Sequence, residues 1–400
     1  MRAKRIPARR LFALASSLLL LGWGSAGAAA PFLPTDDNEV LERLPAGATA
    51  AERELREQQR ALRQHPRNLA LATRVASALI ESGRREADPR YDGYAEAALR
   101  PWWEEREPPP AVRVLRATLR QHRHDFHGAL ADLAGVLAVD PRNAQARLTR
   151  AVILGVRGTP VAALRECLVL SRLANRLVAT TCIGNAAGLG AQAQQGYRLL
   201  LENLENSTNA GTEERVWALT VLAEIATRRG DREAAEQHFQ QALAFRMRDV
   251  YLLGAYADFL LDEGRAADVV RLLQEDTRPD GLLLRLALAE RQLGATALAA
   301  HRAALRARIA ANRLRGDTVH LREEARFSLH LLDEPRQALA LAQANWAVQR
   351  EPWDARLLLE AALAAGDVEA AIPVVHWLEE TGLQDVHLAA LAKRLKGGDE

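Results

Sequence analysis

The sequence predicts an all-α fold, built as a solenoid of repeated helical hairpins. Ala, Leu, Arg, Glu and Gln dominate the composition and β-branched residues are sparse, a balance that favours helices. Gly230 and Asp231 separate two amphipathic stretches whose apolar residues recur at intervals of three and four. The pattern then returns further along the chain. Such repetition predicts hairpins that stack in series rather than elements around one enlarging core.

The repeat is clearest between residues 213 and 264. The positions that keep their character under a shift of about 34 residues are the pairs Leu219 and Leu253, Leu222 and Tyr256, Ala223 and Ala257, and Gly230 and Gly264. This pattern resembles the tetratricopeptide repeat. The resemblance implies a right-handed α-solenoid of about eight or nine hairpins, in which small residues let the two helices of a hairpin approach closely.

The repeats begin after a charged helix. Residues 51–64 have few apolar positions, which suits a terminal cap. Pro66 ends this helix, and Asn68 can cap the next one, residues 69–81, because its side chain accepts from a first-turn N–H. Residues 84–92 are expected to form a loop. The aromatic residues around it either seal the packing or form an exposed recognition patch; they are Tyr91, Tyr94, Trp102 and Trp103.

Units two and three repeat one another but depart from the family pattern in their first helices. Their second helices match it well, with Ala129 in unit two becoming Ala163 in unit three. The first helices instead carry arginines where the family is usually apolar, so a register shifted by one residue stays open. These arginines are Arg113, Arg116, Arg147 and Arg150.

The remaining units follow in order to the end of the chain. Glycines and Asp-Pro or Gly-Asp turns separate their helices. The predicted helices are 178–190 with 191–206, 213–228 with 232–242, the pair flanking Gly264, 282–293 with 296–314, 321–332 with 338–348, 355–364 with 370–380, and a final capping helix at 383–395.

The first 28 residues are predicted to be a cleaved secretory signal peptide. A basic start is followed by an apolar run at 11–23 and by small residues up to Ala28. That run is too short to span a bilayer comfortably, so we expect no transmembrane segment in the mature chain and a periplasmic location. Residues 29–50 are then an extended linker, 51–395 the solenoid, and 396–400 a disordered tail.

Charge and motifs exclude two large classes of function. Removing the five basic residues of the leader from the 53 Lys and Arg leaves 48 against 51 acidic residues, a formal charge of −3. Nucleic-acid binding therefore lacks an electrostatic motive. Metalloprotease, phosphate-loop and serine-hydrolase motifs are missing from the mature sequence, so we expect neither catalysis nor a cofactor.

Two cysteines and three histidines are candidate sites. Cys167 and Cys182 should face each other across an antiparallel helix pair, and a disulfide or two buried thiols are equally compatible with the sequence. His122, His124 and His127 surround one turn. Asp125 is the only further ligand nearby, so we expect a solvated turn rather than a metal site.

The inner surface of the solenoid is the predicted binding site. In the family that the sequence resembles, the first helix of each hairpin lines the concave face. The positions that this resemblance implies are Trp217, Thr220, Glu224, Arg228, Tyr251, Asp258 and Asp262. An aromatic shelf with mixed charge suits an extended or helical peptide. We therefore expect an exported, non-enzymatic scaffold or adaptor that binds a protein or peptide in the cell envelope. The alternatives are a regulatory or assembly subunit of an envelope enzyme or transport complex, and a metal or small-ligand accessory protein.

Overall fold

The computed structural model describes Asp36, residues 50–316 and residues 319–397. The chain divides into two units, Met1–Glu52 and Arg53–Glu400. The predicted signal peptide, and the linker at 29–50 apart from Asp36 and Ala50, lie outside the described residues. The predicted tail at 396–400 does so only from residue 398, because Lys396 still belongs to the last helix.

The described residues form twenty α-helices and one 3₁₀ turn, with no strand, and the all-α prediction is confirmed. The first ten helices are α1 (Ala50–Gln64), α2 (Leu69–Glu86), α3 (Arg90–Trp103), α4 (Pro110–His122), α5 (Phe126–Val139), α6 (Ala144–Val156), α7 (Pro160–Leu170), α8 (Arg176–Gly188), α9 (Ala193–Glu205) and α10 (Thr212–Arg228). The others are α11 (Arg232–Ala244), α12 (Val250–Asp262), α13 (Ala266–Leu273), α14 (Asp280–Leu293), α15 (Leu298–Leu314), α16 (Leu321–Leu331), α17 (Pro335–Val348), α18 (Pro352–Ala365), η1 (Glu369–Ala371), α19 (Ile372–Thr381) and α20 (Val386–Lys396).

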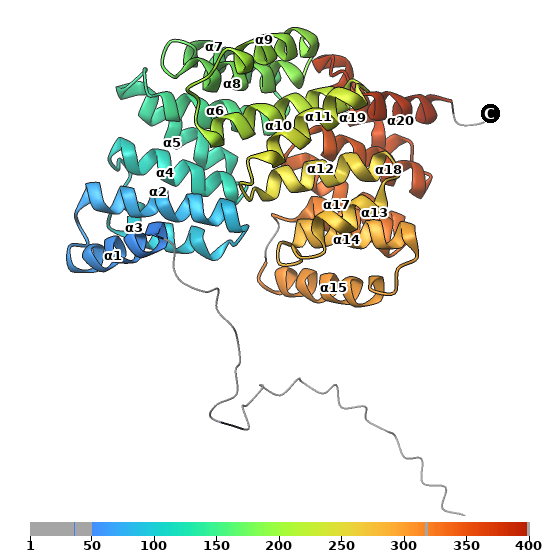
Figure 1. The fold of residues 1–400 in the computed structure, drawn as a ribbon, viewed down its shortest axis with the longest axis horizontal. Coiled ribbons are helices and arrows are strands. Elements are labelled where there is room, and N and C mark those ends of the chain that lie inside the picture. The colour runs from blue at the N-terminus through green and yellow to red at the C-terminus, as the bar shows by residue number, and fades with distance from the viewer. Residues whose placement is uncertain (1–35, 37–49, 317–318, 398–400) are drawn as a thin grey trace, which may run out of the picture. The chain divides into compact units, whose positions relative to one another are not determined.

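These helices pack as successive neighbours, as Figure 1 shows. Nine hairpins run from the pair α2 and α3 to the pair α18 and α19, with α1 before them and α20 after them. The predicted solenoid of about eight or nine hairpins is therefore confirmed. The small residues that the repeat placed between the helices of a hairpin do pack there, since Ala223 and Ala257 are fully buried.

Capping residues set the helix boundaries where the sequence placed them. The side chain of Asn68 accepts a hydrogen bond from the backbone N–H of Leu71, and Asp231 caps α11 through the N–H of Ala234. Gly230 and Gly264 both have positive φ, 76° and 69°. Glycine adopts this left-handed conformation without a steric cost, which explains why it recurs in the hairpin turn.

The first hairpin departs from its prediction. Helix α2 runs on to Glu86 instead of ending before Gly83, and Ala87 closes it in the left-handed conformation. Most of the expected loop is helical, because α3 starts at Arg90 and carries all four aromatic residues. Trp102 and Trp103 pack against the core of this hairpin, whereas Tyr94 is 54% exposed.

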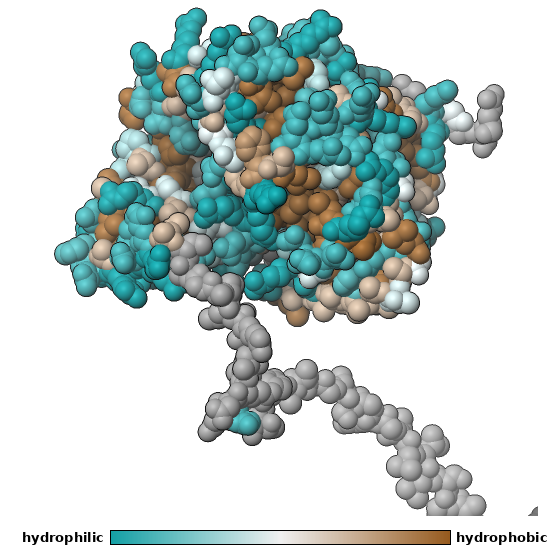
Figure 2. All heavy atoms as spheres, viewed as in Figure 1, coloured by the Kyte–Doolittle hydropathy of each residue, from teal (hydrophilic) through white to brown (hydrophobic). Residues whose placement is uncertain are grey.

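The core is a series of apolar clusters rather than one centre. A cluster under α2 and α3 is followed by clusters within hairpins two to four, a large one around α10 to α14, and a last one under α17 to α20. Each cluster is shared between neighbouring hairpins, as expected for stacked units that cannot bury their apolar stripe alone. On the face drawn in Figure 2, hydrophilic residues predominate and hydrophobic residues form separate patches.

The solenoid also folds back on itself. In the turn after α6, the carbonyl of Gly158 accepts a hydrogen bond from Nε1 of Trp377, at 3.0 Å, although the two residues are 219 positions apart. The backbone N–H of Arg350 donates to the carbonyl of Val156 at 2.7 Å. A Cβ at residue 158 would lie 2.6 Å from Trp377 Nε1, so this close approach requires glycine.

None of the helices in the described part of the chain is long and apolar enough to cross a membrane.

Candidate binding surface

Helices from three successive hairpins meet around a buried carboxylate on α12. Asp258 is 3% exposed and accepts hydrogen bonds from Arg285 of α14, at 2.6 Å, and from Arg326 of α16, at 2.7 Å. Burial alone would raise the pKa of Asp258, but the charges of the two guanidinium groups outweigh it and hold the pKa below its ordinary value. A carboxylate so paired joins three inner helices.

A tryptophan continues this arrangement toward α18. The ring of Trp353 lies between the guanidinium groups of Arg326 and Arg356, each 4.4 Å from the ring centroid. Arg356 in turn donates two hydrogen bonds, both of 2.7 Å, to the carboxylate of Asp262 at the end of α12. We call this set the inner ionic cluster; it consists of Asp258, Asp262, Arg285, Arg326, Trp353, Arg356 and Glu360.

Glu360 completes the cluster on α18. It accepts a hydrogen bond from Arg356 Nε at 2.8 Å and lies 3.1 Å from Nε2 of His330. Burial would raise the pKa of Glu360, but the hydrogen bond from His330 and the charge of Arg356 lower it to about 2. Glu360 is therefore ionised at neutral pH.

A second inner group remains open to solvent. Tyr251, at the start of α12, is 63% exposed, and its hydroxyl donates a 2.7 Å hydrogen bond to Glu224 of α10. Desolvation raises the pKa of Tyr251 above its ordinary value, with a further contribution from the charge of Glu224. Arg228 lies one turn further along α10, half-buried. This group presents an oriented aromatic ring beside one acid and one base.

The predicted partner-binding residues thus fall into different environments. Glu224, Arg228 and Tyr251 come together as the open group. Asp258 and Asp262 are engaged by arginines of later hairpins. Those arginines come from α16 and α18, so the chain covers part of its own inner surface.

The other two predicted residues belong to the packing. Thr220 is 4% exposed and its hydroxyl donates to the carbonyl of Val216. Trp217 is half-buried against two apolar clusters. Neither Thr220 nor Asp258 presents its side chain on an open surface. The repeat pattern identifies which helix faces inward, but it does not report how deeply neighbouring helices cover that helix.

Sequence reasoning missed the arginines that close the inner surface. Arg326 lies in α16, which also carries other charged residues, whereas Arg285 and Arg356 lie within largely apolar helices. An arginine inside such a stretch signals a buried carboxylate partner, since an unpaired buried charge is costly. The partner itself could not be named, because Arg326 and Asp258 are 68 positions apart.

The histidine group is dispersed. His122 pairs with Asp92 of α3 at 3.0 Å, and His124 stacks on Phe126 with ring centroids 5.3 Å apart. His127 is exposed. No group of three His, Cys, Asp or Glu residues suited to a metal ion occurs among residues 50–316 and 319–397 or at Asp36.

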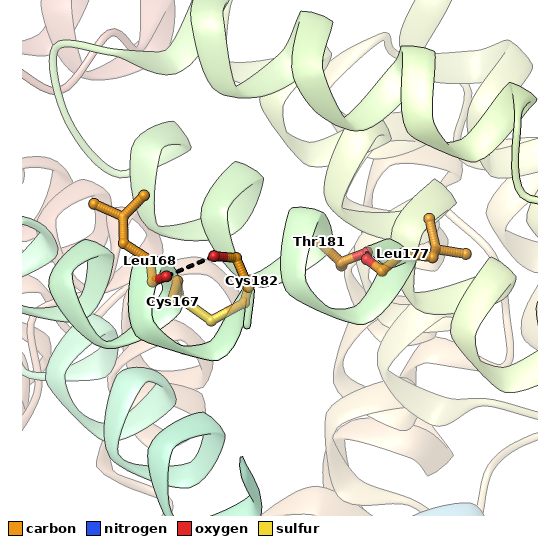
Figure 3. The surroundings of a disulfide bond; sticks show 6 residues. Cys167, Leu168, Leu177, Thr181 and Cys182 are labelled. Atoms are coloured by element: carbon orange, nitrogen blue, oxygen red, sulfur yellow. Dashed lines mark hydrogen bonds between the residues drawn. A yellow bond between two sulfur atoms is a disulfide. The ribbon is translucent and has the colours of Figure 1, made fainter. Parts of the chain in front are cut away.

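Cys167 of α7 and Cys182 of α8 form a disulfide, with Cα atoms 5.4 Å apart (Figure 3). Of the two alternatives left open by the sequence, the structure contains this bond. Both residues are buried, and Thr181 beside it donates a hydrogen bond to the carbonyl of Leu177. The disulfide ties the second helix of hairpin three to the first helix of hairpin four.

The described helices form a solenoid of tetratricopeptide-type helical hairpins. No protein-family model matches the sequence, and no curated protein matches it either. Several solved structures are similar to this chain over most of its length.

A tetratricopeptide repeat protein from Parabacteroides merdae is 14% identical over 78% of this chain and 99% of its own, with a TM-score of 0.38. Human IFIT1, solved as a dimer with m7Gppp-AAAA, is 14% identical over 83% and 86%, with a TM-score of 0.46. A chain of the Cut9–Hcn1 hetero-tetramer of APC/C is 16% identical over 85% of this chain but only 52% of its own, with a TM-score of 0.38.

Proposed function

We propose that this protein is an exported, non-enzymatic scaffold or adaptor that binds a protein or peptide through the open group of Tyr251, Glu224 and Arg228. The observation that carries the proposal is the exposure of Tyr251, 63%, combined with the 2.7 Å hydrogen bond that fixes its hydroxyl on Glu224. A tyrosine held in one orientation offers a large contact area at little cost in conformational entropy.

The chemistry of the group suits a peptide segment with both apolar and charged side chains. The ring of Tyr251 offers the apolar contact, and Arg228 can pair with an acidic side chain of the partner. Asp258 and Asp262 take no part, because Arg285, Arg326 and Arg356 already neutralise them. Their ion pairs instead hold α12 against α14, α16 and α18.

Two observations support export to the periplasm. The first 28 residues have the composition of a signal peptide, and the Cys167–Cys182 disulfide suits an oxidising compartment. Fractionation of cells followed by N-terminal sequencing tests this part. A mature protein starting near residue 29 in the periplasmic fraction is expected, whereas an intact leader on cytoplasmic protein would contradict it.

The binding proposal is tested by Tyr251→Ala in a pull-down from the envelope fraction. We expect recovery of the main partner to fall about tenfold or more, as for a buried interface aromatic. Phe245→Ala is the matched control, because Phe245 is a partly exposed aromatic at the end of the outer helix α11. Equal recovery by both variants would remove the open group as the binding site. If the recovered partner is an enzyme, the regulatory or assembly role applies.

A further inference from the structure

A pocket lies within hairpin two, which is formed by α4 and α5, away from the open group. It has a volume of about 340 Å³ and is bounded by α4, by α5 and by the segment that links α3 to α4. Arg113, Arg116 and Arg120 line it from one face of α4, where spacings of three and four bring side chains together. It shares no lining residue with the group around Tyr251.

Two of the three arginines are already satisfied. Asp132 of α5 accepts hydrogen bonds from Arg116 Nε at 2.8 Å, from Arg116 Nη2 at 2.6 Å and from Arg120 Nη1 at 2.8 Å. Arg116 also donates to the backbone carbonyl of Trp103. Asp132 is thus shared between Arg116 and Arg120 and accepts no hydrogen bond from Arg113.

The side chain of Arg113 has no hydrogen bond or ion pair with any residue that the structure describes, and its Nε is buried without a partner. A glycine creates the space for it. A Cβ at Gly135 would lie 2.0 Å from Arg113 Nη1, so the guanidinium group can occupy this position only because residue 135 has no side chain. Ala131, one turn earlier on α5, also lines the pocket and leaves it open.

Hairpin three shows how the same arrangement is completed by a carboxylate. A shift of about 34 residues carries Arg113 to Arg147 and Asp132 to Glu166. The longer Glu166 side chain reaches Arg147 Nη1 at 2.8 Å and also binds Arg150. Gly135 is replaced there by Val169. Hairpin two thus keeps both the arginine and a carboxylate at the equivalent positions, but the shorter Asp132 binds Arg116 and Arg120 and leaves Arg113 without an acidic partner.

We propose that this pocket binds the carboxylate of a ligand, with Arg113 as the main contact. A guanidinium group holds a carboxylate through two parallel hydrogen bonds. Four arginines and three acidic residues line the pocket, an excess of one positive charge. That balance favours a singly charged carboxylate over a doubly charged phosphate. The volume of the pocket leaves room for the rest of a small acid or for the last residue of a peptide.

Calorimetric titration of the purified protein tests the proposal with four probes. They are N-acetylglycine, acetyl-trialanine with a free carboxylate, the same peptide as its amide, and inorganic phosphate. We expect at least one of the two carboxylates to bind, and the amide and phosphate to bind at least about tenfold more weakly. Equal binding of both acids indicates a small-acid ligand, and preference for the tripeptide indicates a peptide terminus. Failure of both acids to bind, or equal binding by the amide or phosphate, would overturn the proposal.

Variants assign the binding to Arg113. Arg113→Gln and Gly135→Val should each weaken binding of the preferred acid at least about tenfold, the second by displacing the guanidinium group while keeping its charge. Arg147→Gln is the matched control, because Arg147 occupies the equivalent position but is paired with Glu166. Unchanged affinity in both Arg113→Gln and Gly135→Val would reject the site, as would an equal loss in Arg147→Gln. Far-UV circular dichroism verifies that each variant is folded.

Discussion

Hydrogen-bond and charge partners set the pKa values of Asp258 and Glu360 inside this solenoid, and they outweigh the effect of burial. Glu360 illustrates the balance, because desolvation opposes its charge while His330 and Arg356 favour it, and its pKa falls from 4.5 to about 2. A carboxylate whose pKa is lower in the folded than in the unfolded state stabilises the fold above its unfolded pKa. That stabilisation disappears as the pH falls through the folded pKa.

Glu360→Gln should remove this contribution. We expect the variant to be less stable than the original protein by about 3 kcal/mol near neutral pH, since each pKa unit corresponds to about 1.4 kcal/mol. The difference should shrink as the pH is lowered from about 4.5 toward 2, the window between the two pKa values. Urea unfolding at several pH values measures it. A difference independent of pH would mean that Glu360 acts through packing alone.

Individual helix-packing residues were predictable, whereas inner-surface accessibility was not. Ala223 and Ala257 were identified from the repeat and are fully buried. Thr220 and Asp258 were assigned to a partner by the same periodicity, yet one is covered by its own helix neighbours and the other by Arg285 and Arg326. Periodicity reports which side of a helix faces inward, but exposure depends on contacts between distant repeats.

At the scale of elements, hairpins three and four are joined covalently as well as by packing. The Cys167–Cys182 bond links α7 to α8 across a sequence separation of 15. Most helix boundaries followed from caps and turns in the sequence. Helix α3 did not, because Asp88-Pro89 and the aromatic cluster read as a loop, while the structure uses Pro89 to begin the helix.

Replacing both cysteines by serine should lower the free energy of unfolding by about 3 kcal/mol, the chain-entropy value for a closed loop of about 15 residues. The original protein under reducing conditions should show a similar loss. Thermal unfolding of the three samples makes the comparison. If the double variant matched the oxidised protein in stability, the bond would have no role in holding these hairpins together.

For the solenoid as a whole, stability is shared between repeats that are far apart in sequence. Asp258 contacts arginines of α14 and α16, and Trp377 of α19 binds the turn after α6. A simple array of repeats depends only on contacts between neighbours. This protein adds contacts that skip several hairpins, so its unfolding should be more cooperative than that of an open array.

Asp258→Asn tests this coupling. Loss of the charge leaves Arg285 and Arg326 without their counterion, and we expect a cost of about 3–5 kcal/mol with a single unfolding transition. Asp333→Asn is the control, because Asp333 is exposed and its pairing with Arg291 should contribute less than about 1 kcal/mol. Equal small effects in both variants would show that the hairpins of α12, α14 and α16 are not coupled through this carboxylate.

The contact between Trp377 and Gly158 has a consequence for biosynthesis. Ribosomes deliver the hairpins in order, so the turn after α6 emerges long before the tryptophan that will cover it. Until the C-terminal helices have been synthesised, the carbonyls of Val156 and Gly158 lack these protein donors and must bond to water instead. Nonsense mutations late in the gene would therefore remove Trp377 and leave the turn after α6 exposed, and such shortened products should be targets for quality-control proteases.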